Sequence, residues 1–240
     1  YMLEHWIYKK ADAVIFTMEG GKQYIIDQGW EKDVPLDKIY YINNGVDLEV
    51  YHRQEQENIF HDPELEQGDT FKVMYTGSMG QANSMFDILD AAEKLKDRAD
   101  IRFLLFGAGY LEDDLKKYAR KKHLENVSFK GKVDKKYIPN ILSKGDLNLM
   151  TAPSDKVSDY GLSMNKTFDY MASGKPTVSN IRTKFDILEE THSGVTVRAG
   201  DPATQAGAGV RFHGMDKTDT EEYGKNAREG GKRSDSQKQT

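Results

Sequence analysis

The residues best suited to chemistry lie in the stretch "SMNKTFDYMASGKP", residues 163–176. Lys166 and Asp169 are one turn apart on the polar face of a predicted helix, and apolar residues at i, i+4 and i+7 form its other face. Gly174 and Pro176 end the helix. Free backbone N–H groups at a helix start, with a lysine beside them, favour an anion such as phosphate. The alternative is an amphipathic helix whose polar face is only solvated.

Two glycine-rich loops follow predicted strands. "YTGSMGQANSM", residues 75–85, has Gly77 and Gly80 for close backbone approach, and its polar side chains include Ser78 and Gln81. It is compatible with phosphate or sugar binding and equally with a plain tight turn. "FGAG", residues 106–109, contains part of a dinucleotide-binding fingerprint without the third glycine, so Gly107 is only a candidate border of a ligand.

A third loop, "FKGKV", residues 129–133, places Gly131 and Val133 directly after a strand. A flat nucleobase could lie against such a backbone. In open α/β sheets, ligands bind beyond the carboxyl ends of the strands, and all of these loops are predicted at that edge.

Other catalytic chemistries find no support in the sequence. The chain has no cysteine, and the spacing of its six histidines does not suit zinc. The acidic run at 112–114 falls on the first turn of a predicted helix, where acids complement the helix dipole. We therefore expect no metal site.

Composition narrows the class further. The 240 residues have a net charge of −5 with both signs interspersed, which argues against a nucleic-acid partner. No apolar run is long enough to cross a membrane, and the N-terminus lacks the pattern of a signal peptide. The sequence predicts a soluble, cytoplasmic protein.

The elements that must position these residues alternate between strands and helices. Strands are predicted at 13–17, 39–42, 71–76, 101–106, 127–130, 147–150, 177–179 and 195–197. Helices are predicted at 19–29, 85–97, 111–122, 135–144, 163–173, 184–190 and 202–212. Apolar strands that are each followed by a helix indicate an α/β fold with a doubly wound, Rossmann-like parallel sheet.

The sequence predicts four segments. Residues 1–47 would be the remnant of an N-terminal domain, since two strands are too few for a sheet of their own. The polar stretch 48–70 shows no clear period and is predicted to be a linker. Residues 71–215 would form the Rossmann-like domain. Residues 216–240 are predicted to be a weakly ordered tail, because no Leu or Ile follows Leu188.

Several motifs together resemble glycosyltransferase family 4. They are "ADAVIFTMEGGKQYIIDQG", "IYYINNGVDLEVY", "KVMYTGSMGQANSMFDILDAAEKL", "LLFGAGYLEDDLKKYARKKHLENVSFKGKV" and "GLSMNKTFDYMASGKPTVSN", in that order. The resemblance covers about residues 2–201. It implies the C-terminal, donor-binding half of a retaining GT-B enzyme, of the subgroup that makes bacterial capsular polysaccharide and O-antigen.

The resemblance also implies roles for residues. Lys166 would neutralise the donor diphosphate, and Asp169 would hold the ribose in place of the family's usual Glu. The first Glu of the family's Glu-x7-Glu motif falls at Gly161, so Asp159, or backbone amides from Ser163 to Asn165, would replace it. The catalytic candidates are Lys166 and Asp159. The donor-binding candidates are Gly77, Ser78, Gly80, Gln81, Gly107, Gly131, Val133, Ser163, Asn165, Lys166 and Asp169.

Partners follow from the same resemblance. The donor would be a nucleotide-diphosphate sugar, with UDP as the expected carrier, and the acceptor a polysaccharide or a lipid-linked saccharide. No cofactor is expected. The full-length enzyme would associate with the inner face of the membrane, residues 1–47 would self-associate, and this fragment alone would be inactive. Two alternatives stay open: a non-catalytic nucleotide-binding module, and a GT-B sugar-nucleotide epimerase.

Overall fold

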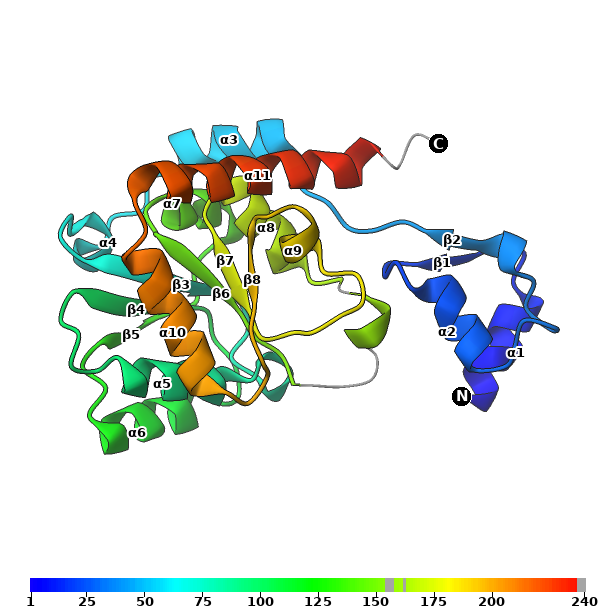
Figure 1. Ribbon diagram of the computed structural model, residues 1–240, viewed down its shortest axis with the longest axis horizontal. Coiled ribbons are helices and arrows are strands. Elements are labelled where there is room, and N and C mark those ends of the chain that lie inside the picture. Colours follow the sequence, from blue (N-terminus) through cyan, green and yellow to red (C-terminus); the bar gives the residue numbers. More distant parts are fainter. Residues whose placement is uncertain (154–157, 162, 237–240) are drawn as a thin grey trace.

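The structure, a computed structural model, describes residues 1–153, 158–161 and 163–236. A six-stranded sheet with the order β5-β4-β3-β6-β7-β8 forms its centre (Figure 1). All neighbouring strands in this sheet are parallel. The strands are β3 (Phe71–Thr76), β4 (Ile101–Phe106), β5 (Val127–Gly131), β6 (Leu147–Met150), β7 (Thr177–Ser179) and β8 (Gly194–Thr196). The predicted doubly wound parallel sheet is confirmed.

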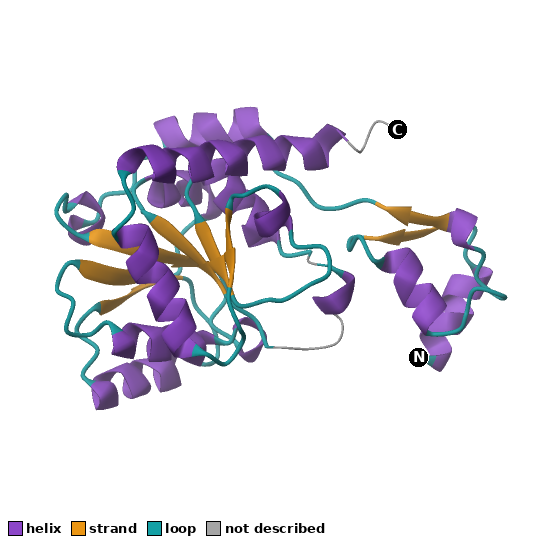
Figure 2. Cartoon of the chain, in the orientation of Figure 1, coloured by secondary structure: helices purple, strands orange, loops and turns teal. Residues whose placement is uncertain are grey.

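Helices cover both faces of this sheet (Figure 2). One face carries α5 (Met85–Lys94), α6 (Glu112–Lys122) and α10 (Pro202–His213). The other face carries α4 (Pro63–Glu66), α7 (Ile138–Ser143), α8 (Asn165–Ser173) and α9 (Ile187–Glu190). Outside this layer, α3 (Leu48–Glu57) packs on α7, and α11 (Lys217–Ser236) packs on α8. Short 3-10 turns are η1 (Leu36–Lys38), η2 (Gln81–Asn83), η3 (Lys135–Tyr137) and η4 (Ser158–Tyr160). The central strands are apolar on both sides because each side packs against helices.

Residues 1–42 form a smaller unit. It comprises α1 (Met2–Lys10), β1 (Val14–Phe16), α2 (Gly21–Asp27) and β2 (Ile39–Tyr41). The two strands pair in parallel around a small core of their own, apart from the main sheet (Figure 1). Ile15 and Tyr40 are partners in this pairing and are 59% and 51% exposed, so one face of the two-stranded sheet is uncovered.

The prediction of a linker at 48–70 is wrong. Residues in this stretch form α3 and α4, and Tyr51 and Leu65 are almost fully buried. Asn140 on α7 also fastens the segment, because its side chain donates to the Glu55 carbonyl and accepts from the Phe60 N–H. Two buried apolar side chains and the polar contacts of Asn140 with the backbone hold this segment in place. Neither kind of contact requires apolar residues at helical spacing, so no pattern in the sequence indicated the helices.

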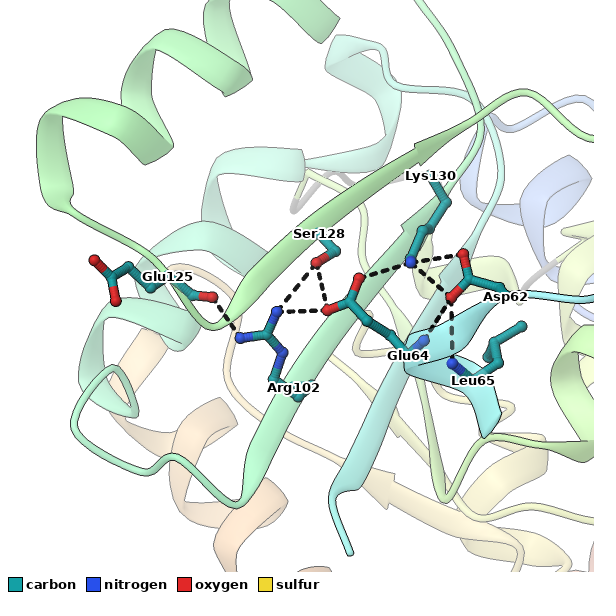
Figure 3. Close-up of polar contacts among 7 residues, drawn as sticks. All are labelled: Asp62, Glu64, Leu65, Arg102, Glu125, Ser128 and Lys130. Atoms are coloured by element: carbon teal, nitrogen blue, oxygen red, sulfur yellow. Dashed lines mark hydrogen bonds and ion pairs between the residues drawn. The ribbon is translucent and has the colours of Figure 1, made fainter. Parts of the chain in front are cut away.

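A network of charged side chains attaches α4 to the edge of the sheet (Figure 3). Lys130 on β5 lies 2.7 Å from Asp62 and 2.6 Å from Glu64. Arg102 on β4 and Ser128 on β5 also donate to Glu64. Burial raises the pKa of Glu64, but the hydrogen bonds from these three side chains outweigh it and lower the pKa to about 2. The carboxylate form of Glu64 therefore stabilises this edge.

The prediction of a weakly ordered tail from residue 216 is also wrong for the described part, because α11 is a 20-residue helix that packs on α8. Gly224 lies so close to Gly174 that a Cβ there would overlap the Gly174 carbonyl oxygen. Ala227 and Gly230, at helical spacing from Gly224, are buried as well. Residues 237–240 of the predicted tail lie outside the described residues. No helix in the described chain has the length and apolar character that a membrane span requires.

Candidate functional site

The candidate site lies where the strand order reverses. From β3 the chain moves outward through β4 to β5, and then returns to place β6 on the other side of β3. This reversal is the usual ligand position in open α/β sheets, at the carboxyl ends of the strands. The loops after β3, β4 and β5 meet there, because the Gly77 N–H donates to the Phe106 carbonyl (3.0 Å) and the Gly107 N–H to the Gly131 carbonyl (2.8 Å).

Gly107 has no room for a side chain. Its φ is +146°, and a Cβ at this position would overlap the Gly77 carbonyl oxygen. The Met79 N–H donates to the Ala108 carbonyl at 2.9 Å, so the two loops lie against each other along several residues. Gly107 is thus needed for the contact between these loops, whether or not a ligand is bound.

Lys166 lies directly beside the loop after β3. Its Nζ donates to Asn83 Oδ1 at 2.6 Å and to the Tyr75 hydroxyl at 3.2 Å. The same Nζ lies 4.5 Å from the centre of the Tyr75 ring and 3.0 Å from where a Cβ on Gly77 would be. Burial lowers the pKa of Lys166 to about 8. The structure therefore brings together Lys166 and Gly77, which are separated by about ninety residues in the chain.

Asn83 and Tyr75 also fix the loop itself. Asn83 Nδ2 donates to the Ser78 hydroxyl at 2.9 Å and to its carbonyl at 3.1 Å. The Tyr75 hydroxyl donates to the Ser78 carbonyl at 2.7 Å, and Thr151 donates to the Asn83 carbonyl at 2.6 Å. This network sets the shape of the loop before any ligand arrives.

The start of α8 leaves backbone donors uncapped. Its N-cap residue is Met164, which has no side-chain oxygen to accept from the first turn. Asn165 is exposed at the first helical position. Ser163 accepts a hydrogen bond from Asn44 at 3.2 Å, so this approach to the helix also contacts the segment that follows β2. An uncapped helix start next to Lys166 attracts negative charge.

Asp169 lies one turn further along α8. Burial raises the pKa of its carboxyl group, and the charge of Lys135 partly opposes that shift. Lys135 belongs to η3, which follows the loop containing Gly131 and Val133, so a charge from this part of the chain acts on Asp169. Val133 itself packs against the core on that face of the sheet.

The remaining candidates are less central. Asp159 is exposed in η4, whose Tyr160 accepts from the Gly20 N–H at 2.7 Å and donates to Asp27 at 2.9 Å. This turn is attached to the N-terminal unit, and among the described residues no hydrogen bond or ion pair joins Asp159 to Lys166. Gly80 is buried beside the Tyr110 ring. The Gln81 N–H donates to the Tyr110 hydroxyl at 2.9 Å, and Gln81 itself is exposed.

Sequence reasoning named Asn83 only as one of the residues that offer hydrogen bonds in its loop, and it gave Tyr75 no role. Asn83 was visible as a polar residue of the loop, but its contact with Lys166 depends on how α8 crosses the end of β3. Tyr75 looked like an ordinary strand residue. Among the described residues, no three His, Cys, Asp or Glu side chains lie close enough to share a metal ion. Whether ligand binding needs a metal stays a prediction.

These features define a Rossmann-like domain with its candidate site at the switch point of the sheet. Residues 70–213 match the family described as glycosyl transferases group 1, which is more than half of the chain. The chain belongs to this family. A comparison with curated proteins gave no match.

Solved structures show the same fold. The chain is 22% identical to Staphylococcus aureus TarM, with a TM-score of 0.70, covering 96% of this chain and 43% of that one. It is 18% identical to sucrose-phosphate synthase from Thermosynechococcus elongatus, with a TM-score of 0.73, covering 97% and 56%. Anabaena HepE gives 19% identity and a TM-score of 0.71, covering 97% and 62%. The chain thus spans about half the length of these proteins.

Proposed function

We propose that this chain is the donor-binding part of a retaining glycosyltransferase of family 4. It would take a sugar from a UDP-sugar, without a metal or other cofactor, and transfer it to a polysaccharide or lipid-linked acceptor in capsule or O-antigen synthesis. The full-length enzyme would work in the cytoplasm, at the inner face of the membrane. The position of Lys166 between Gly77 and the uncapped start of α8 is the observation that supports this proposal best.

Lys166 is suited to a diphosphate leaving group. An ammonium group has three N–H donors, and two of them are used by Asn83 and Tyr75. The third is available to a phosphate oxygen, together with the backbone N–H groups of the first turn of α8. Lys166 and these N–H groups would neutralise the negative charge that develops on the diphosphate as the bond between sugar and phosphate breaks.

Two of the similar structures contain a matching ligand class. Anabaena HepE was solved with UDP-glucose, and S. aureus TarM with UDP and α-GlcNAc-glycerol. Both proteins are below 25% identical to this chain, so the similarity shows a shared fold only. UDP and UDP-sugars are therefore the ligands with which we test the proposal.

Calorimetry with UDP, GDP, ADP and uridine tests donor binding. We expect UDP to bind more tightly than the other diphosphates, and uridine to bind far more weakly because it lacks the diphosphate. In a thermal unfolding assay, UDP at 100 times its Kd should stabilise the protein by about 2.7 kcal/mol. Equal affinities for UDP and uridine would contradict the role of Lys166.

Transfer requires a separate test, since this chain alone is expected to be inactive. Positioning donor and acceptor together can contribute about 7–11 kcal/mol, and part of that positioning would come from the other half of a GT-B enzyme. A chimera that joins the N-terminal half of Anabaena HepE to this chain should transfer sugar from a UDP-sugar. A folded chimera that binds UDP without transfer would favour a binding module, and conversion of the UDP-sugar without acceptor would favour an epimerase. Multiple-turnover transfer by the chain alone would overturn its predicted inactivity.

A further inference from the structure

A second polar pocket lies at the carboxyl ends of β7 and β8. It has a volume of about 250 Å³ and is formed by the loop after β7, the start of α9 and the end of β8. Its charged and hydroxyl-bearing lining residues are Arg182, Thr183, Asp186, Glu189, Thr196 and Arg198. None of these residues belongs to the candidate donor site.

The sheet order separates the two sites. β8 is three strands from β3 in the order β3-β6-β7-β8. At the usual spacing of neighbouring strands this amounts to about 14 Å. Both sites open at the carboxyl edge of the sheet, so a chain of linked sugars bound at the second pocket could extend toward the first.

The charged groups of the pocket are not paired with each other. The side chains of Arg182 and Arg198 are exposed, and neither is within hydrogen-bond or ion-pair distance of a described residue. Arg198 does lie near Asp201, whose pKa is lowered mainly by hydrogen bonds from Thr204 and more weakly by the charge of Arg198. Asp186 Oδ1 accepts from two backbone N–H groups at the start of α9, which leaves its other oxygen available. Two guanidinium groups and two carboxylates therefore share a small pocket without neutralising one another by contact.

Thr196 lies on β8 in the lining of the pocket. Its Oγ1 is shielded from solvent and has no hydrogen-bond partner among the described residues. A ligand in the pocket would therefore contact other atoms of Thr196, and the polar contacts would come from the charged side chains of the lining.

We propose that this pocket binds one neutral sugar unit of the acceptor saccharide. The inference rests on the proposed function and goes beyond it by locating part of the acceptor. A sugar hydroxyl can accept from a guanidinium group and donate to a carboxylate at the same time, which matches the balanced charges of the lining. A phosphate or carboxylate ligand would be attracted by Arg182 and Arg198 but repelled by Asp186 and Glu189.

Amide NMR titration of the UDP-saturated chain tests this inference. The probes are methyl α-glucoside, methyl N-acetylglucosaminide and inorganic phosphate. We expect at least one glycoside to shift amide signals within residues 182–198, while phosphate does not. Loss of a hydrogen bond from a charged donor should make Arg198→Gln and Arg182→Gln each raise the glycoside Kd about tenfold. Lys184→Gln, in the same loop but outside the lining, is the matched control.

The inference is overturned if neither glycoside shifts these signals at about 100 mM, or if phosphate alone does. It is also overturned if Arg198→Gln and Arg182→Gln both leave the glycoside Kd unchanged. UDP binding is followed separately through the amides of residues 77–84. Glycoside binding at 182–198 without any response of 77–84 to UDP would support this pocket and contradict the proposed donor site.

Discussion

Replacing Lys166 by methionine should weaken UDP binding and stabilise the folded protein at the same time. Methionine has nearly the same volume, so the change removes the charge without opening a cavity. The buried ammonium group is unfavourable in the free protein, which is why its pKa falls from 10.5 to about 8. The same charge is favourable once a diphosphate lies beside it.

The two magnitudes follow from separate interactions of the ammonium group. A fall in pKa from 10.5 to about 8 sets an upper limit of about 3 kcal/mol on the cost of burying the charge. Asn83 Oδ1 has no donor in the variant, which offsets about 1–2 kcal/mol, so a net gain of about 1–2 kcal/mol is expected at pH 7. Removing one charge-assisted hydrogen bond to UDP corresponds to about 1.5–3 kcal/mol, or about 10- to 150-fold in Kd.

Chemical denaturation and calorimetry at several pH values measure both effects. Because the folded-state pKa of Lys166 is lowered, the unfolded chain binds more protons between pH 8 and 10.5, and wild-type stability should rise across that window. Lys166→Met should lack this rise. Lys117→Met is the control, since Lys117 is exposed on α6 and pairs with Asp114 at the surface.

Two results would refute this reasoning. An unchanged UDP affinity in Lys166→Met would exclude a diphosphate contact. A destabilised variant that loses uridine and UDP to the same extent would show that Lys166 holds α8 and the loop after β3 together, and that its effect on the ligand is indirect.

Four further outcomes are expected. Gly107→Ala should abolish UDP binding and destabilise the fold by about 1–3 kcal/mol in urea denaturation, whereas Gly131→Ala, which has open space around it, should cost only about 1 kcal/mol. The folded-state pKa of Glu64 is lowered from 4.5 to about 2, so its contribution of about 1–2 kcal/mol is present above pH 4.5 and lost as the pH falls toward 2; acid titrations of Glu64→Gln should lack that loss. UDP affinity measured by calorimetry should be unchanged by EDTA, and a requirement for added magnesium or manganese would contradict this. Sedimentation should show self-association of the chain that decreases when Ile15 and Tyr40 are both changed to lysine, and a monomeric wild type would exclude it.

The strands of the main sheet could be predicted from the sequence because buried parallel strands are apolar throughout. The predicted ranges 71–76, 101–106, 147–150 and 177–179 coincide with β3, β4, β6 and β7. Each strand needs only its own residues and the turn that follows it to be recognised. The fold class followed from this local information.

The candidate site could be predicted only in part, since its contacts join distant segments. The spacing around Lys166 located a helix start that favours anions, and the glycines located the loops. The bond from Lys166 to Asn83 depends on the crossing of α8 over the end of β3, which no local pattern encodes. The helices α3 and α11 were missed for a related reason. Tyr51 is the buried residue of α3, and the buried residues of α11 are small, so neither helix shows a period of large apolar residues in the sequence.

The packing of α11 on α8 has a consequence for how sequence changes should be judged there. A helix held by aliphatic side chains tolerates exchange of one such residue for another and suffers from their removal. At Gly224, where α11 meets the Gly174 backbone, the sensitivity is reversed, because any added atom separates the two helices. The same separation would strain the hydrogen bond that Arg228 donates to the Ser173 carbonyl at 3.3 Å. By hydropathy this segment looks dispensable, yet the axial position of α8, and with it the reach of Lys166, depends on residues that have almost no side chain.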